Sequence, residues 1–296
     1  MPSITTILRV ATIVYALIFL IYFVKDCLAH KEDFKGRNHI ALCIIGFLTN
    51  FVDTLGVGSF ATTQASFKIT KASEDEIMPG TLNVGDCIPV MYEFILFLSL
   101  IEIAPLTLLT MIAGAIIGSL VGAKIVSKWS VKVVRIALGC ALIFLGAMMA
   151  CRLAKIGPFG IAGTATALHG AKLVISIAVN FLLGALMTIG AGLYTPCIAL
   201  CSIMGLNIKV AFPVMFGSCA FLMPSCGFEF IRSGRYDRVA AAWLTGAGIV
   251  GITIAYFIVK EMPTTLLTGI IIVVMFYTAF MFLRDAFKTP AKESAK

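Results

Sequence analysis

The sequence predicts an all-α polytopic membrane protein made of two homologous halves, each with a broken or re-entrant segment that contains glycines. Three observations lead to this fold class. Long apolar runs cover most of the chain, a pattern of glycines in the first half recurs in the second, and two of the runs contain helix breakers. Of the 296 residues, 60% are hydrophobic and 13% are charged, and the mean hydropathy is +1.02. Ordinary soluble domains are less apolar, whereas apolar runs of about 20 residues are typical of membrane spans.

Nine apolar runs follow one another along the sequence. They cover residues 4–24, 40–67, 83–101, 105–123, 133–151, 173–204, 208–230, 239–259 and 264–283. The intervals between them are too short for a soluble domain. The first run is longer than the apolar part of a signal peptide, and no small-residue cleavage site follows it closely, so we expect a retained first span.

The composition argues against several other classes of protein. The net charge is +8, but Lys and Arg lie mainly between the apolar runs, where they set the orientation of spans and contact anionic lipid. No basic surface interleaved with aromatic residues indicates binding to nucleic acid. The nine cysteines form no C-x-x-C pair and the three histidines lie outside the runs, so we expect no metal site and no cofactor. Without a nucleophile–base pair or a phosphate-binding loop, the sequence does not predict an enzyme.

The second half of the sequence repeats features of the first. The residues that recur 132 positions later are Gly85, Cys87, Met91, Gly114, Ala123, Ala147, Met149 and Arg152, which match Gly217, Cys219, Met223, Gly246, Ala255, Ala279, Met281 and Arg284. Thr54, Gly56 and Gly58 recur 134 positions later, as Thr188, Gly190 and Gly192. Duplicated halves with helix breakers at matching positions are typical of secondary transporters. The predicted organisation is a first span and loop (1–38), repeat 1 (39–152), a connecting loop (153–172), repeat 2 (173–284) and a polar cytoplasmic tail (285–296).

The runs 40–67 and 173–204 are longer than a bilayer requires. A helix of about 30 residues extends about 45 Å, against a hydrocarbon core of about 30 Å. Each run is therefore either a tilted, broken span or a re-entrant hairpin that turns at its glycines. The hairpin arrangement segregates Lys and Arg more sharply between the two sides of the membrane, so we prefer it. It gives three full crossings in each repeat. The repeats are then inverted, with the N-terminus outside and the C-terminus cytoplasmic in a plasma or inner membrane.

The helix breakers of the second long run predict a short helix that begins inside the membrane. Thr195 is a good N-cap, Pro196 is favoured at the first helical position, and Gly205 fits a C-terminal cap. In repeat 1 the equivalent N-cap candidates are Ser59 and Thr62. The first N–H groups of such a helix have no intrahelical partner and its dipole is positive there. The helix start can therefore bind an anion.

Glycines can also serve helix packing alone. We interpret Gly114, Gly118 and Gly122, which recur every four residues, as a packing face and not as a binding site. For the glycines of the two breaks, their recurrence at matching positions favours binding over packing.

Three stretches resemble a known family of permeases. The sequence GAGLYTPCIALCSIMGLNIKVAFPVMFGS (190–218) is similar to the second glycine motif of sulfite exporter TauE/SafE-type permeases. The sequences GFLTNFVDTLGVGSFATTQASFK (46–68) and PGTLNVGD (79–86) resemble the first motif of that family. The resemblance covers residues 40–284. It implies an internally duplicated permease that moves a small anion, often sulfite or an organosulfonate.

The same resemblance implies the residues that contact the substrate. They are Gly56, Gly58, Ser59, Asn83 and Gly85, with Thr62 as a further candidate, in repeat 1, and Gly190, Gly192, Thr195, Pro196, Gly217 and Ser218 in repeat 2. Repeat 1 departs from the family pattern, because Ser59 and Thr62 stand where many members have further glycines and the proline. Asp86 stands opposite Ser218, which makes the two half-sites chemically unequal.

Four acidic residues lie within the apolar runs or at their edges, namely Asp53, Asp86, Glu93 and Glu229. Such residues are costly in a membrane and are usually functional. A fixed carboxylate would repel an anion, so our hypothesis is that Asp53 or Asp86 is protonated, or holds a cation, during transport. Alternatively, Asp53 caps backbone groups of the break, and Glu93 and Glu229 lie in a wet vestibule or near an interface.

Together these features predict a secondary transporter, with sulfite, an organosulfonate or a related sulfur-containing anion as the substrate and protons as candidate coupling ions. An uncoupled anion channel and a transporter of a small carboxylate are the alternatives. Besides the substrate, the expected partner is the lipid bilayer, with assembly into a homo-oligomer as a further candidate.

Overall fold

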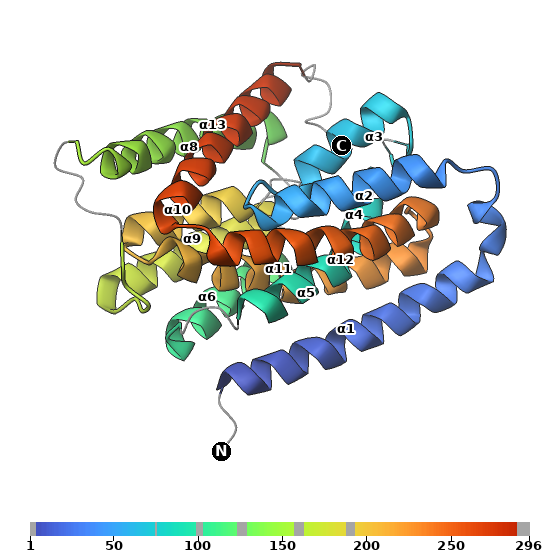
Figure 1. The fold of residues 1–296 in the computed structure, drawn as a ribbon, viewed down its shortest axis with the longest axis horizontal. Helices are drawn as coiled ribbons and strands as arrows, with labels where there is room; N and C mark the ends of the chain where they lie inside the picture. The colour runs from blue at the N-terminus through green and yellow to red at the C-terminus, as the bar shows by residue number, and fades with distance from the viewer. Residues whose placement is uncertain are drawn as a thin grey trace. The chain divides into compact units, whose positions relative to one another are not determined.

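The computed structural model of the protein describes residues 4–74, 76–98, 103–122, 129–156, 163–187 and 193–288 (Figure 1). In chain order the helices are α1 (Ile4–Ala29), the 3₁₀ helix η1 (Lys31–Phe34), α2 (His39–Thr54), α3 (Ser59–Thr70), α4 (Met78–Gly85), α5 (Cys87–Phe97), α6 (Pro105–Ile117), the π-helical turn η2 (Gly118–Gly122), α8 (Val131–Leu153), α9 (Gly170–Met187), α10 (Tyr194–Met204), α11 (Ile208–Ser233), α12 (Arg238–Glu261) and α13 (Thr264–Lys288). These described ranges contain no strand, and one isolated bridge joins Ala165 to Leu206. The all-α class expected from the sequence is confirmed.

Six helices of the described chain are long and apolar enough to cross a membrane. They are Ile4–Ala29, Lys132–Leu153, Gly170–Met187, Ile208–Ser233, Arg238–Glu261 and Thr264–Phe287. On α1, large apolar side chains such as Val10, Leu17 and Ile21 are more than half exposed. Such a surface is unfavourable in water but suits contact with lipid tails. The helices are those of a polytopic membrane protein.

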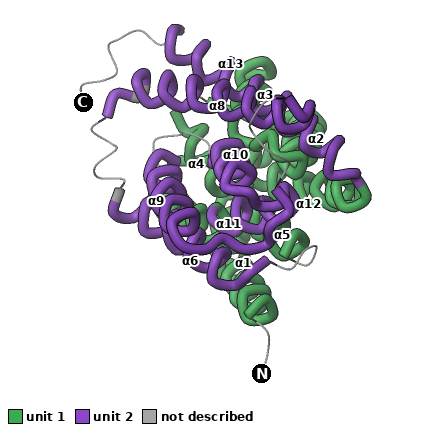
Figure 2. The backbone as a smooth tube through the Cα atoms, turned by 90° about the vertical axis from the view of Figure 1, so that its left-hand side faces the viewer, with its two compact units in different colours: residues 1–100, 219–261 green, residues 101–218, 262–296 purple. Residues whose placement is uncertain are grey.

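The chain forms two compact units, which are residues 1–100 with 219–261 and residues 101–218 with 262–296 (Figure 2). Unit 1 contains α1 to α5 and α12, whereas unit 2 contains α6, α8, α9, α10 and α13. Helix α11 contributes its first part to unit 2 and its second part to unit 1. Each unit therefore takes helices from both predicted repeats. The compact units do not follow the repeat boundaries, and the duplication itself stays a prediction.

In unit 1, α2 packs along α12 through glycines at the contact (Figure 1). A Cβ atom added to Gly46 would lie 2.5 Å from the carbonyl oxygen of Trp243, and one added to Gly248 would lie 2.7 Å from Nδ2 of Asn50. The two helices run in the same direction, because the order of these contacts is the same in both. The missing side chains let the backbones approach closely, as in other small-residue contacts between membrane helices.

Unit 2 contains a pair of the same kind, formed by α6 and α9. A Cβ added to Gly114 would lie 3.0 Å from the carbonyl oxygen of Ile177, and Gly118 packs directly on the backbone of Phe181. The packing role predicted for Gly114 and Gly118 is therefore confirmed. By the spacing of the predicted repeats, α6 corresponds to α12 and α9 to α2. The helix pairing in the two units is therefore the pairing that a duplication would produce.

In unit 1 the chain turns back between α2 and α3. Arg37, just before α2, donates a hydrogen bond of 2.8 Å to the carbonyl oxygen of Ala72, just after α3. Leu42, near the start of α2, and Phe67, near the end of α3, belong to the same buried apolar cluster. The two helices are antiparallel, so the hairpin predicted for residues 40–67 is confirmed and the straight crossing is wrong.

Unit 2 contains a second hairpin, formed by α9 and α10. The segment before α9 pairs with the segment after α10, because Asn207 N–H donates to Ala165 O at 2.9 Å and Ala165 N–H donates to Gly205 O at 3.2 Å. Gly205 ends α10 with a φ of 100°, as predicted. The second long run also turns back, although α9 alone has the length and composition of a span.

Candidate functional site

The turn between α2 and α3 depends on two glycines. Gly56 has a φ of 90° and Gly58 a φ of 85°, a backbone conformation that residues with a Cβ rarely adopt. The N–H of Gly56 donates to the carbonyl oxygen of Asp53 at 2.7 Å, at the end of α2. The two predicted site glycines therefore shape the turn, and α3 begins immediately after it.

The start of α3 is capped by a carboxylate from α2. Gly58 occupies the N-cap position and offers no side chain, and Oδ1 of Asp53 accepts a hydrogen bond of 2.7 Å from the N–H of Ser59. Asp53 is fully buried. The prediction that Ser59 or Thr62 is the N-cap is wrong, since Ser59 is the first helical residue and the Thr62 hydroxyl donates to the carbonyl oxygens of Gly58 and Ser59. The alternative, in which Asp53 caps the break, is confirmed.

Two further carboxyl groups of unit 1 are fully buried, those of Asp86 and Glu93. Asp86 lies at the junction of α4 and α5, where its Oδ1 is 3.4 Å from Nδ2 of Asn50. Oε1 of Glu93, on α5, accepts a hydrogen bond of 2.6 Å from Thr54. The hydroxyl of Ser59 interacts with the carboxyl groups of both Asp53 and Asp86. The α2–α3 turn thus brings Asp53, Asp86 and Glu93 into one polar cluster, which we call the carboxyl cluster.

The carboxyl cluster is incompletely paired. Oδ2 of Asp53, Oδ2 of Asp86 and Oε2 of Glu93 are buried and have no hydrogen-bond partner among the described residues. The ion pairs found in the described chain involve other acids, namely Asp26, Glu32, Asp33, Glu229 and Asp237. An ionised carboxylate that is buried without a partner is very unfavourable, and a proton, a cation or water would relieve that cost. Within the described ranges, no three His, Cys, Asp or Glu side chains are placed to hold a metal ion.

Glu93 differs from its sequence-based prediction. We expected Glu93 and Glu229 in a wet vestibule or near an interface, and the side chain of Glu229 is indeed 74% exposed and lies 3.8 Å from Arg232. Glu93 is fully buried, so the prediction for this residue is wrong. Its position inside the otherwise apolar helix Cys87–Phe97 is the signal that could have identified it.

The remaining site candidates of repeat 1 are Asn83 and Gly85. Among the described hydrogen bonds, neither residue bonds to an acid of the carboxyl cluster. Asn83 donates its side-chain amide to the carbonyl oxygen of Pro79, on its own helix, at 2.8 Å. Gly85 packs against α12, where an added Cβ would lie 2.9 Å from the Cα of Ala241. The carbonyl oxygen of Gly85 accepts a hydrogen bond of 2.8 Å from Thr245. Gly85 therefore fixes the approach of α4 to α12, next to Asp86.

In unit 2 the start of α10 differs from the prediction. The helix begins at Tyr194 after Leu193, so Thr195 is not the N-cap and Pro196 lies in the first turn. Proline is tolerated there because the first N–H groups have no intrahelical partner. The hydroxyl of Thr195 lies 3.5 Å from that of Thr278 on α13. Gly190 and Gly192 lie outside the described residues.

A buried asparagine organises each unit beside its hairpin. In unit 2, Nδ2 of Asn180 donates to Oγ of Ser218 at 3.0 Å and to the carbonyl oxygen of Met111 at 2.7 Å. In unit 1, Nδ2 of Asn50 faces Asp86 at 3.4 Å and the carbonyl oxygen of Leu244 at 3.5 Å. Asn50 thus connects α2, the first helix of its hairpin, with α12 and with Asp86, which follows the buried Gly85. Asn180 connects α9, the first helix of the second hairpin, with α6 and with Ser218, which follows the buried Gly217.

By the spacing of the predicted repeats, Ser218 corresponds to Asp86, and it follows the buried Gly217 as Asp86 follows the buried Gly85. Unit 1 thus has a carboxyl group where unit 2 has a hydroxyl, and the inequality of the two half-sites stays a prediction. Asn50 and Asn180 were not predicted as site residues. A buried amide side chain within an otherwise apolar helix, a short distance before each break, is the signal that could have identified them.

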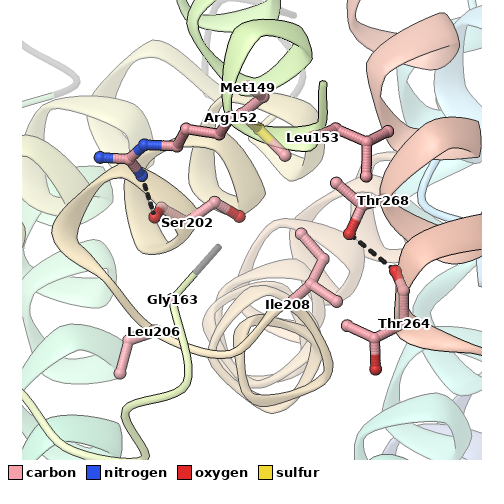
Figure 3. A pocket seen from close by; sticks show the side chains of 9 residues that line it. All are labelled: Met149, Arg152, Leu153, Gly163, Ser202, Leu206, Ile208, Thr264 and Thr268. Atoms are coloured by element: carbon pink, nitrogen blue, oxygen red, sulfur yellow. Dashed lines mark hydrogen bonds between the residues drawn. The ribbon is translucent and has the colours of Figure 1, made fainter. Parts of the chain in front are cut away.

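A small pocket in unit 2 lies at the other end of α10 (Figure 3). It is lined by Met149, Arg152, Leu153, Gly163, Ser202, Leu206, Ile208, Thr264 and Thr268. Arg152 donates a hydrogen bond of 2.9 Å to the carbonyl oxygen of Ser202, as Figure 3 shows. A cation is favourable at the carbonyl end of a helix, so this contact stabilises the end of α10.

A larger polar pocket of unit 1 lies where the loops before α2, after α3 and before α12 meet. Arg37 and Asp237 form an ion pair of 2.6 Å at its edge. Tyr236 donates a hydrogen bond of 2.5 Å to Asp26, which also pairs with Arg238 at 2.7 Å. Burial, together with the hydrogen bond to the Asp26 carboxylate, raises the pKa of Tyr236 above its ordinary value. These contacts hold the end of α1 and the start of α12 together.

Comparison with known proteins finds no matching family model, no matching curated protein and no matching solved structure. The described residues by themselves establish an all-α polytopic membrane protein with a buried carboxyl cluster at a glycine turn of unit 1.

Proposed function

We propose that the protein is a secondary transporter for a small anion and that protons are its coupling ions. The observation that carries this proposal is the start of α3, a helix that follows a glycine turn and whose first N–H group is held by the buried carboxylate of Asp53. Helix breaks of this kind form substrate and ion sites in many secondary transporters. The N-terminal end of a helix suits an anion, and carboxyl groups in the protein interior suit protons.

The class of anion follows from the resemblance of residues 40–284 to sulfite exporter TauE/SafE-type permeases. Sulfite, organosulfonates and related sulfur-containing anions are therefore the substrates that we propose. The predicted contacts are Gly56, Gly58 and Ser59 in repeat 1, and Thr195, Pro196 and Ser218 in repeat 2. The distribution of Lys and Arg between loops supports an orientation in the cell membrane with an outside N-terminus and a cytoplasmic C-terminus.

The proposal is tested by transport into liposomes that contain the purified protein. We expect saturable uptake of labelled sulfite that is driven by a pH gradient, and no uptake in protein-free liposomes. Uptake that ignores the pH gradient and does not saturate would indicate a channel. A thermal-shift series with sulfite, sulfate, thiosulfate, sulfonates and carboxylates identifies the substrate class, and stabilisation by carboxylates alone would overturn the sulfur assignment.

A second candidate is a transporter whose substrate is a cation. The unpaired oxygens of the carboxyl cluster favour it, because they would attract a cation as well as a proton. Uptake of an alkali cation by the same liposomes, with no response to any anion of the series, would replace the first proposal with the second.

A further inference from the structure

The N-terminus of α3 already holds a carboxyl group of the protein itself. Oδ1 of Asp53 accepts the N–H of Ser59 at 2.7 Å, and Gly58 at the N-cap supplies no side chain of its own. Helix α3 has 12 residues, long enough for the dipoles of its peptide groups to add up at its first turn. A small anion that used this helix start would therefore have to replace the Asp53 carboxylate.

The surroundings of Asp53 show that its own pairing is incomplete. Its first carboxyl oxygen, Oδ1, accepts the Ser59 N–H at the start of α3. Its second carboxyl oxygen, Oδ2, is buried and has no hydrogen-bond partner among the described residues. The hydroxyl of Thr63, one turn into α3, is also buried and without a described partner. Buried polar atoms without a partner require an explanation, and a bound ion or water at the helix start is one that fits Oδ2 of Asp53.

We propose that Asp53 is an internal substitute for the transported anion, and that the anion binds at the start of α3 only after Asp53 has taken up a proton and released the Ser59 N–H. This inference rests on the proposed function and assigns its coupling group. The proton moves from the aqueous phase to a carboxyl oxygen of Asp53, and the anion takes over the hydrogen bond to the helix. For a monovalent anion the formal charge of the site stays the same, because one negative charge is neutralised when another enters.

The titratable groups that face Asp53 are both acids. Asp86 approaches from the junction of α4 and α5, and Glu93 approaches from α5. Among the described residues, α3 and α12 add no titratable side chain to this set of interactions. In the described hydrogen bonds, neither Asp86 nor Glu93 accepts a backbone N–H at the start of α3, since Asp86 faces Asn50 and the hydroxyl of Ser59, and Glu93 faces Thr54. Of the three carboxyl groups, Asp53 is therefore the one whose hydrogen bond to the Ser59 N–H an anion at the start of α3 would have to replace.

The experiment is isothermal titration calorimetry of the purified full-length protein with methanesulfonate, a sulfonate that stays ionised from pH 5 to pH 8. Measurements in two buffers with different ionisation enthalpies give the number of protons taken up on binding. We expect one proton for each bound anion, and an affinity that rises about tenfold per unit fall in pH while Asp53 is ionised, because linked equilibria are reciprocal. The variant Asp53→Asn should bind without proton uptake and with an affinity that no longer depends on pH.

Two comparison variants make the result specific. Glu229→Gln changes an exposed carboxyl group that pairs with Arg232, and it should behave as the unmodified protein. Proton uptake that persists in Asp53→Asn, or that disappears only in Asp86→Asn, would overturn the assignment to Asp53. Binding by the unmodified protein without any proton uptake would also overturn the inference but would leave an anion transporter standing. No binding of methanesulfonate, sulfite or sulfate would count against the proposed function itself.

A second pair of variants covers the case in which Asp53→Asn does not fold. Ser59→Pro removes the backbone N–H at the first position of α3, where proline is favoured in helices, and Gly58 already has the extended ψ of 124° that a following proline requires. Ser59→Ala keeps this N–H and removes only the hydroxyl. We expect a loss of methanesulfonate binding of at least tenfold in Ser59→Pro relative to Ser59→Ala. Equal affinities in the two variants would exclude the helix start as the anion site.

Discussion

The carboxylate of Asp53 accepts a hydrogen bond from the backbone N–H of Ser59 across the α2–α3 turn, at 2.7 Å. Asp53 belongs to the last turn of α2 and Ser59 is the first residue of α3, so one side chain joins the end of one helix to the start of the next. The glycine turn alone would leave the first N–H groups of α3 unpaired in the protein interior. Asp53 supplies an acceptor for one of these groups, the N–H of Ser59.

The first prediction concerns the stability of this turn. Asp53→Asn keeps an oxygen that can accept the Ser59 N–H, whereas Asp53→Ala removes every acceptor. We expect Asp53→Ala to be less stable than Asp53→Asn by about 1 kcal/mol, the usual contribution of an N-cap side chain. Thermal unfolding of the two purified variants in the same detergent measures the difference, and equal unfolding temperatures would show that the cap does not stabilise the hairpin.

The second prediction concerns the glycine contact between α2 and α12. A Cβ on Gly251 would overlap the backbone carbonyl of Phe47, whereas a Cβ on Gly246, in the same helix, would have no atom within 4 Å. We expect Gly251→Ala to destabilise the protein by about 1–3 kcal/mol, as overpacking usually does. Gly246→Ala should be neutral or stabilising by up to about 1 kcal/mol because alanine favours helices.

Thermal unfolding checks this pair of variants as well. The matched control is useful because both substitutions are chemically identical and lie within six residues of one helix. If Gly251→Ala were as stable as Gly246→Ala, the close approach of α2 and α12 would not be required for stability.

The third prediction concerns the hairpin topology. Lys35 lies before α2 and Lys71 follows α3, and both line the same polar pocket of unit 1. Single cysteines at these two positions should react with a membrane-impermeant thiol reagent from the same side of the membrane. Mass spectrometry locates the modified residue, so the native cysteines do not interfere. Labelling of the two positions from opposite sides would restore the straight crossing of residues 40–67.

The fourth prediction concerns alkaline pH. Because burial and the bond to Asp26 raise the pKa of Tyr236, its phenol keeps its proton in the folded protein at pH values where an unfolded chain, with a tyrosine pKa of 10.0, loses it. The stabilising effect is complete below pH 10 and decreases as the pH rises above that value. Thermal unfolding between pH 8 and pH 11 should show a steeper loss of stability for the unmodified protein than for Tyr236→Phe. Tyr277→Phe, in which an exposed ring of α13 is changed, should match the unmodified protein.

Much of the site could be predicted because its signals are local. Glycines at 56 and 58 indicated the turn, the glycine at 205 indicated a helix end, and acids in apolar surroundings indicated Asp53 and Asp86. The cap was assigned to the wrong side chains, since Ser59 and Thr62 are good caps by residue type but the turn brings Asp53 closer. The start of α10 was misplaced for a similar reason, because the preference of Thr195 for the N-cap position is weaker than the packing that extends the helix to Tyr194.

The sequence by itself determined the features that depend on composition and on neighbouring residues. They are the all-α membrane class, the presence of a break in each of the two long runs, and the glycines at which α3 begins and α10 ends. Only the tertiary structure decided which residues meet across those turns. It buried Glu93, paired Asn50 with Asp86 and Asn180 with Ser218, and built each compact unit from helices of both repeats. These contacts join residues that are distant in the chain, so their energies depend on helix packing and leave no periodic pattern in the sequence.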